Sequence, residues 1–215
     1  MQLQETCVVP PTRHPPEELL LDYSSGAASA PESLMIAAHL ARCPECRRLT
    51  IACDALGGVF LDALAPTSMP PNMLNRTLAA IDQGGAEDAE ESGSVIADLG
   101  KLPETSGWRK VPGGYGMLRV PCASDTGRVW LLKAPAGKGL LRHRHVGDEW
   151  TVVMRGAFRD QTGRYGPGDF AYLADGFEHQ PIAEPGQDCV CLIMIRDQPR
   201  YTTLIGKLAA PFVRL

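Results

Sequence analysis

The sequence lacks three features that mark large classes of proteins. No stretch of its 215 residues approaches the roughly 20 uninterrupted apolar residues of a transmembrane helix. The first residues are polar and interrupted by proline, so they do not resemble a secretory signal. An excess of basic residues is also missing, because the formal net charge is -4 and proteins that hold nucleic acid are normally basic. We therefore expect a cytoplasmic protein that binds no membrane and no nucleic acid directly, and that has a protein partner or a small ligand.

An even set of cysteines suited to disulfides is missing as well. The chain has seven cysteines, and two of them form a C-x2-C pair. In a cytoplasmic chain this pattern points to metal or redox chemistry rather than to disulfides. The remaining composition is ordinary, with 44% hydrophobic and 21% charged residues, which is typical of a globular protein. At 215 residues the chain is long enough for two compact domains.

The residue pattern changes along the chain and predicts a two-domain α+β protein. The pattern is helical from Pro15 to about Gln83, within a predicted first domain at 1–83. Residues 95–200, the predicted second domain, contain short predicted strands separated by Gly and Pro. The segment GGAEDAEESGS at 84–94 is acidic, rich in glycine and has little to bury, so we expect a solvated linker. The alternative is that its acidic residues contact a basic partner surface. Residues 201–215 are expected to form a tail that packs on the second domain.

Capping signals and apolar spacing predict four helices in the first domain. We expect them to begin near Pro16, Ser29, Pro44 and Pro71. A four-helix bundle of about 70 residues has a small core, so a bound metal would add needed stability. Some apolar side chains are left over, and as a set they predict a surface for a protein partner: Val59, Phe60, Leu64, Met69 and Met73. The alternative for each of them is a place in the core.

One group of candidate metal ligands lies at the ends of these helices. His39 ends the second predicted helix, and Cys43 and Cys46 share a face at the first turn of the third. The spacing H-x3-C-x2-C is typical of a closed structural Zn2+ site, and the positive end of the helix dipole favours both thiolates. His14 is the candidate fourth ligand. The alternatives are a solvated His14 and two cysteines in the core.

A second group, with nitrogen and oxygen ligands only, lies in the second domain. His143 and His145 are two apart on a predicted strand, so both side chains point to one face. Glu149 opens the returning strand after a turn, and His179 follows later. Three imidazoles and one carboxylate leave positions open on Zn2+, iron or manganese. The alternative is a buried polar cluster without metal, which would be costly to desolvate.

Both groups lie in segments that resemble known domains. The segments RHPPEELLLDYSSG and AAHLARCPECRR are similar to the zinc-binding anti-sigma domain, and MPPNMLNRTLAAID is similar to its fourth helix. This resemblance implies a zinc site made of His14, His39, Cys43 and Cys46. The segments GKGLLRHRHVGDEWTVVMRG and GDFAYLADGFEH resemble the two motifs of a cupin, an antiparallel β-barrel with a double-stranded β-helix fold, although Ala174 stands where that family usually has Pro. The cupin resemblance implies a metal site made of His143, His145, Glu149 and His179.

The order of the two domains is similar to that of ChrR-type anti-sigma factors over nearly the whole chain. This resemblance implies that helices within residues 16–82 bind an extracytoplasmic-function sigma factor and block its binding to RNA polymerase. It also implies that the cupin senses or modulates an oxidative signal, through a small-molecule or peroxide ligand. We expect a regulator without catalytic residues. The alternative is a metal-dependent, dioxygenase-like cupin enzyme whose zinc-stabilised helices serve oligomerisation.

Five cysteines lie outside the zinc motif: Cys7, Cys53, Cys122, Cys189 and Cys191. We expect buried structural thiols at these positions. Cys189 and Cys191 are two apart on a predicted strand and share a face, but a disulfide between them would need distortion of the backbone. The alternative is that one of these two thiols reacts when the cupin metal meets peroxide.

Overall fold

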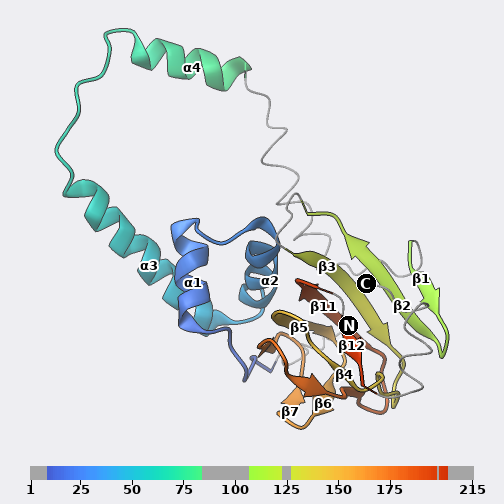
Figure 1. Cartoon of the computed structure of the whole chain (residues 1–215). Coiled ribbons are helices and arrows are strands. Elements are labelled where there is room, and N and C mark those ends of the chain that lie inside the picture. The colour runs from blue at the N-terminus through green and yellow to red at the C-terminus, as the bar shows by residue number, and fades with distance from the viewer. Residues whose placement is uncertain (1–8, 84–106, 123–126, 198, 203–215) are drawn as a thin grey trace, which may run out of the picture.

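The chain forms a helical half followed by a β half (Figure 1). The computed structural model describes four stretches, residues 9–83, 107–122, 127–197 and 199–202. The predicted linker at 84–94, the tail after Thr202 and Cys7 lie outside the described residues, so the domain boundaries stay a prediction. The predicted α+β arrangement, with four helices followed by a β half, is confirmed.

The four helices lie where the sequence predicted them: α1 (Glu17–Ser25), α2 (Ala30–Leu40), α3 (Pro44–Asp62) and α4 (Met73–Gln83). α1 ends at Gly26, whose φ of 75° is a left-handed conformation that glycine adopts at little cost. α2 begins with a capping box, in which the Glu32 carboxylate accepts a hydrogen bond from the Ser29 amide at 2.8 Å. α3 begins after Cys43, whose sulfur accepts from the Cys46 amide at 3.4 Å. Local sequence therefore sets each of these helix ends.

Three antiparallel sheets make up the β half. The largest has the strand order β1-β2-β3-β11-β5-β8, and the two smaller ones have the orders β10-β6-β7 and β12-β4-β9. The strands are β1 (Arg109–Val111), β2 (Tyr115–Val120), β3 (Arg128–Ala134), β4 (His143–Arg144), β5 (Glu149–Arg155), β6 (Phe158–Asp160), β7 (Gly163–Tyr165), β8 (Phe170–Leu173), β9 (Glu178–His179), β10 (Ile182–Ala183), β11 (Cys189–Ile195) and β12 (Arg200–Tyr201). Because β11 inserts between β3 and β5, segments distant in the sequence close around a common interior.

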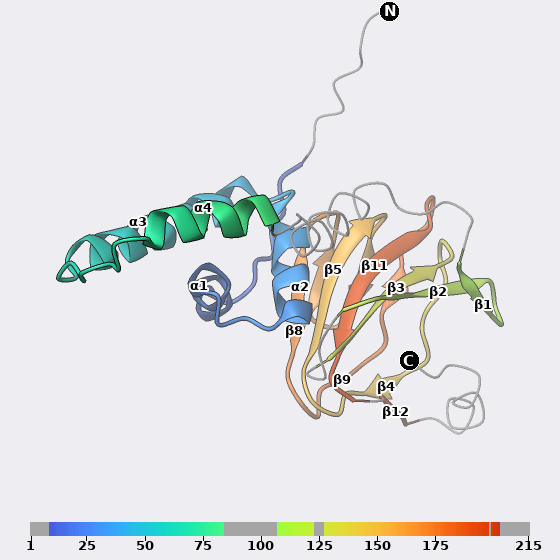
Figure 2. The same cartoon turned by 90° about the horizontal axis from the view of Figure 1, so that it is seen from above.

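The two halves share one hydrophobic core. α2 packs against β5 and β11, and Figure 2 shows it lying between α1 and the large sheet. One buried cluster joins Met35 and Ile36 of α2 to Trp150 of β5 and Leu192 of β11. The four helices were predicted correctly, but α2 also packs on the β half and so its core is not separate from that of the sheet. Every residue from Leu34 to Leu40 is buried, so α2 has no polar face and needs cover on both sides.

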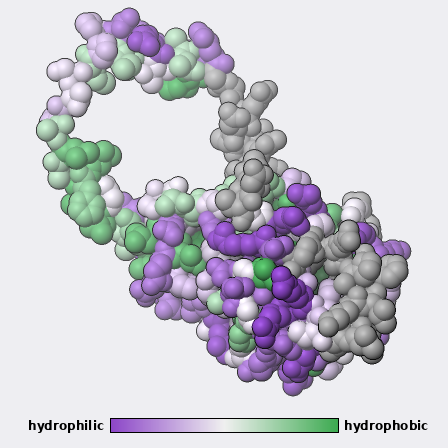
Figure 3. All heavy atoms as spheres, viewed as in Figure 1, coloured by the Kyte–Doolittle hydropathy of each residue, from purple (hydrophilic) through white to green (hydrophobic). Residues whose placement is uncertain are grey.

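The outer part of α3 and all of α4 contribute little to this core. α4 buries none of its residues and stands apart from the other helices in Figure 1. Apolar side chains gather over the outer part of α3 in the space-filling view (Figure 3). The large apolar side chains exposed along this region are Leu56, Val59, Phe60, Leu61, Leu64, Met69, Leu74, Leu78 and Ile81. Four members of the predicted surface are thus exposed, and the fifth, Met73, is half-buried.

Candidate metal centres

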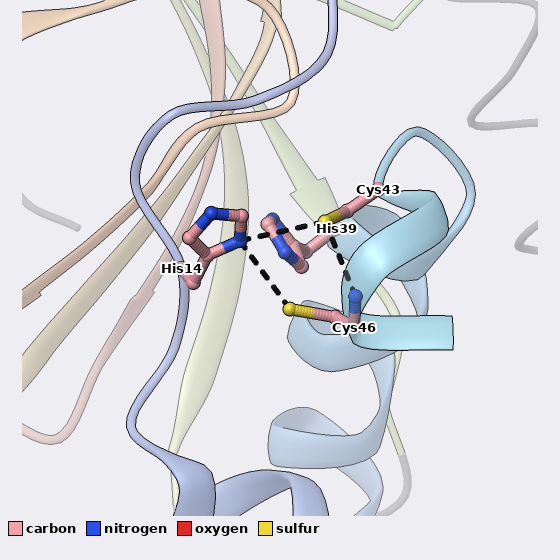
Figure 4. A group of neighbouring side chains, drawn as sticks. All are labelled: His14, His39, Cys43 and Cys46. Carbon is pink, nitrogen blue, oxygen red and sulfur yellow. Dashed lines mark hydrogen bonds between the residues drawn. The ribbon is translucent and has the colours of Figure 1, made fainter. Parts of the chain in front are cut away.

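Four side chains of the helical half converge where α2, α3 and the segment before α1 meet (Figure 4). They are the four predicted ligands His14, His39, Cys43 and Cys46, and their ligand atoms all lie within 4.8 Å of one another. The Nδ1 atom of His14 is 3.4 Å from both sulfur atoms. A tetrahedral ion about 2.3 Å from sulfur and about 2.0 Å from nitrogen holds such atoms about 3.5 Å apart. The spacing therefore fits one shared metal ion.

His39 has the features of a ligand held in one tautomer. Its ring is fully buried, and Nδ1 lies 2.7 Å from the carbonyl oxygen of Gly168, to which we assign it as the donor. The other nitrogen, Nε2, is then an acceptor, and it has no hydrogen-bond partner among the described residues. Burial lowers the pKa of His39, so the ring is neutral. A buried acceptor without a partner is costly, and a metal ion at Nε2 would satisfy it.

The two sulfur ligands give this centre its metal preference. Burial, with a further contribution from Cys43, raises the pKa of the Cys46 thiol to about 12. Without a cation the Cys46 thiol is therefore protonated at neutral pH, whereas a coordinated cation favours the thiolate. Two sulfurs and two imidazole nitrogens form a donor set that suits Zn2+ in a closed site. His14 is on the solvent side, since 32% of its side chain is exposed.

Three histidines of the β half form a second group of converging ligands: His143, His145 and His179. Pairing of β4 with β9 places His143 opposite His179, and His145 follows directly after β4. The Nε2 atom of His179 is 2.9 Å from Nε2 of His145 and 3.2 Å from Nε2 of His143. All three rings are buried. The sequence prediction that these residues meet at one point agrees with this geometry.

Neighbouring groups orient two of these rings. His143 Nδ1 donates to the carbonyl oxygen of Leu141 at 2.7 Å, and His179 Nδ1 donates to the Asp160 carboxylate at 2.8 Å. Each of these bonds leaves Nε2 free to act as a ligand. Burial lowers the pKa of His143 to about 4 and that of His145 to about 3. Neutral imidazoles with aligned Nε2 atoms are the form in which histidine binds a metal.

Glu149 is close to this group but does not point into it. Its Oε2 atom lies 3.2 Å from Nδ1 of His145, the ring nitrogen that does not face the other two histidines. Burial raises the pKa of Glu149 to about 7. In this conformation the carboxylate orients His145, and ligation by Glu149 itself stays a prediction.

A cavity of about 540 Å3 lies beside the three histidines. His143, His179 and Glu149 are among its polar lining residues, and most of the wall is apolar, including Met117 and Phe158. This volume is in the range of sites for small organic molecules. The cavity can therefore place an apolar molecule beside the candidate metal ligands.

Cys189 and Cys191 line the same cavity. Both are buried free thiols with their sulfur atoms 3.6 Å apart. The contact with Cys189 and burial raise the pKa of Cys191 well above its usual value. The expectation of buried thiols is thus confirmed for this pair, whereas Cys53 and Cys122 are only partly buried. Reaction of either cavity thiol with peroxide stays a prediction.

Two carboxylates near these centres were not identified from the sequence. Asp160 holds His179, and hydrogen bonds from His179 and Thr162 lower its pKa although burial would raise it. Asp169 is 4% exposed and receives hydrogen bonds from the segment that leads to His14. The only sequence signal for Asp169 is its position after Gly168 in the second cupin motif.

Among the described residues, no helix combines the length and the apolar character needed to cross a bilayer.

Comparisons with known proteins agree along nearly the whole chain. A family model described as the ChrR cupin-like domain matches residues 98–198. The anti-sigma-E factor ChrR of Cereibacter sphaeroides is 34% identical over 209 residues, which cover 94% of this chain and 98% of that protein.

Solved structures give the same result. The crystal structure of Rhodobacter sphaeroides SigE in complex with the anti-sigma ChrR matches with a TM-score of 0.73 and 33% identity, over 85% of this chain and 98% of that one. An RmlC-like cupin protein from Ralstonia eutropha matches 46% of this chain and 68% of its own at 21% identity, and its TM-score of 0.41 is too low to inform function. On the sequence and structural similarity to ChrR, the chain belongs to the ChrR family of anti-sigma factors.

Proposed function

We propose that this protein is a regulator that sequesters an extracytoplasmic-function sigma factor and so blocks its binding to RNA polymerase. The observation that supports this most directly is the exposed apolar surface of α3 and α4 in a chain of the ChrR family. Gathered apolar side chains on open helices mark sites for protein partners. The related ChrR chain was crystallised in complex with SigE. We propose that the protein acts in the cytoplasm, where a sigma factor meets RNA polymerase.

The helical half would hold Zn2+ through His14, His39, Cys43 and Cys46. When bound, this ion would link three segments that have little core of their own. His39 ends α2 and is fixed against the β half, while Cys43 and Cys46 lie at the start of α3. The four side chains therefore set the direction in which α3 leaves the core. That direction determines where its exposed apolar side chains are presented.

The β half would hold a second metal, Zn2+, iron or manganese, through its three histidines and Glu149. When bound, this metal would offer an open coordination position to a small molecule or a peroxide. The apolar wall of the adjacent cavity would bind the rest of such a ligand. Asp160 and the carbonyl group of Leu141 keep two imidazoles in place for this purpose. We propose that this half senses or modulates an oxidative signal.

Capture of partners tests the main proposal. Tagged full-length protein is recovered from a lysate of its host, and bound proteins are identified by mass spectrometry. The control is a variant in which His39, Cys43 and Cys46 are all replaced by Ala. Recovery of a sigma factor with the wild-type chain but not with the control supports both sigma binding and the role of the zinc ligands. Absence of any sigma factor from the wild-type sample contradicts the proposal.

A second candidate function is catalysis by the β half, because three histidines beside an apolar cavity also suit a metal-dependent oxygenase. The metal-loaded chain, free of any sigma factor, is incubated with an organic hydroperoxide and with a diketone. Sustained turnover of either compound favours the enzyme. Consumption of no more than about one equivalent favours the regulator.

A further inference from the structure

A turn of the β half contacts the metal centre of the helical half. This turn, Gly166–Phe170, leads from the end of β7 into the first residue of β8 and lies against the ends of α2 and of the segment before α1. Its Gly168 carbonyl oxygen accepts the hydrogen bond from His39 Nδ1 at 2.7 Å. Of the described groups, this carbonyl is the one that sets which nitrogen of His39 is available to a metal.

The next residue of the turn, Asp169, is hydrogen-bonded to the segment directly before His14. Its Oδ1 atom accepts hydrogen bonds from the backbone amides of Thr12 at 2.6 Å and Arg13 at 3.0 Å. Its Oδ2 atom accepts from the Gly166 amide at 2.7 Å, which closes the turn on itself. Asp169 is 4% exposed, so the carboxylate relies on these donors rather than on water. Loss of the carboxylate would release the residues directly before His14.

Further contacts hold the segment before α1 against the β half. The Phe170 amide donates to the Arg13 carbonyl oxygen at 3.0 Å, so the two segments bond in both directions. The Arg13 guanidinium donates to the Thr162 carbonyl oxygen and lies 5.5 Å from the centre of the Tyr165 ring. His14 thus follows a segment whose backbone is fixed on the β half, although His14 itself belongs to the helical half.

We propose that the Gly166–Phe170 turn of the cupin completes the zinc centre of the helical half, with Asp169 and the Gly168 carbonyl group as positioning groups for His14 and His39. This inference rests on the proposed zinc site. Removal of a group that orients a metal ligand commonly lowers metal affinity by about 10- to 100-fold. By reciprocity, zinc bound at the centre stabilises the contact between the two halves.

The test measures how fast Cys43 and Cys46 become alkylated in the full-length, zinc-loaded protein in the presence of a chelator. Mass spectrometry of the peptide that carries both cysteines separates this centre from the metal of the β half. Asp169→Ala removes the carboxylate. Its matched control is Asp188→Ala, which removes a carboxylate that accepts from the Ala136 amide elsewhere in the β half.

A second pair of variants changes the same turn through the backbone. An added Cβ at Gly168 would lie 2.7 Å from Cγ of Pro11 and 3.0 Å from Cβ of Arg42, so Gly168→Ala pushes the turn away from the helical half. Gly186 has a similar left-handed φ of +96° but nothing within 4 Å of such a Cβ. Gly186→Ala therefore applies the same backbone strain without the contact.

We expect alkylation about 10- to 100-fold faster in Asp169→Ala and in Gly168→Ala than in their respective controls. Rates equal to those of the controls in folded variants would overturn the inference. If wild-type Cys43 and Cys46 are alkylated equally fast with and without zinc, the proposed zinc site itself fails, which is a separate result.

A measurement on the unchanged protein covers the case in which the variants do not fold. Hydrogen exchange is followed in peptides that contain Thr12, Arg13 and Phe170, before and after chelation of zinc. Zinc removal should increase exchange at these three amides while the strands β3 and β11 remain protected. Unchanged exchange at the three amides after loss of zinc from Cys43 and Cys46 would contradict the positioning role.

Discussion

Phe60 offers a sharp test of sigma-factor binding through α3. Its side chain is 65% exposed two residues before the helix ends, among other exposed apolar side chains. Replacement by Ala removes the ring without weakening α3, because Ala is the better helix former. The protein should therefore keep its fold while the apolar surface loses its largest side chain.

The size of the effect follows from the exposed area. A phenylalanine has an accessible area of about 200 Å2, so the 65% exposed in the free protein corresponds to about 130 Å2. Burial of that area in a complex contributes about 3 kcal/mol at about 25 cal/mol per Å2. The methyl group of Ala retains part of this contribution, so Phe60→Ala should cost about 2 kcal/mol. That cost raises Kd by about 30-fold.

The assay is calorimetric titration of the full-length protein with the sigma factor recovered in the capture experiment. Ile182→Ala is the control, since Ile182 is also an exposed apolar residue, at 41%, but lies on β10 of the β half. A Kd within about threefold of wild type for Phe60→Ala, or an equal loss in the control, would refute the assignment of the surface to α3.

Three further predictions concern the metals and the core. His179→Ala should lower the metal content by about one equivalent per chain, measured by elemental mass spectrometry. Loss of both metals would contradict separate centres. Met35 is 0% exposed in the shared core, so Met35→Ala should lower the free energy of unfolding by about 2–5 kcal/mol. Calorimetry should then show one cooperative transition with a lower Tm, and two independent transitions would contradict a shared core. Zinc affinity of the helical half should fall as pH falls, because burial raises the pKa of Cys46 in the metal-free protein and protons compete with the metal. Each displaced thiol proton changes affinity by about tenfold per pH unit in a chelator competition, and a pH-independent affinity would argue against thiolate ligands.

Local sequence signals predicted the ends of the first three helices. Gly26 ends α1, Ser29 and Glu32 start α2, and Pro44 starts α3, because each signal acts through hydrogen bonds or backbone angles within a few residues. The same is true of the metal groups, since helical and strand spacing decides which side chains share a face.

The packing partners of the helices were not readable in this way. Apolar spacing shows that a helix face is buried but not what covers it, so α2 was expected inside a bundle and instead packs on β5 and β11. The role of Asp169 depends on contacts across about 157 positions of the chain, which no local pattern reports. The orientation of Glu149 depends on a side-chain conformation that spacing does not determine.

The position of α2 within the shared core determines what a proteolytic cut between the two halves would do. A single cut in the chain between α4 and β1 would leave α2 buried between α1 and the sheet, held also by the Glu32 to Arg196 ion pair at 2.8 Å. The two fragments of the cleaved protein would stay associated, with the helical half in place. Such a cut would separate the halves only if the helical half also unfolded or left the sheet. Where cleavage is fast, the rate of that unfolding would limit the separation.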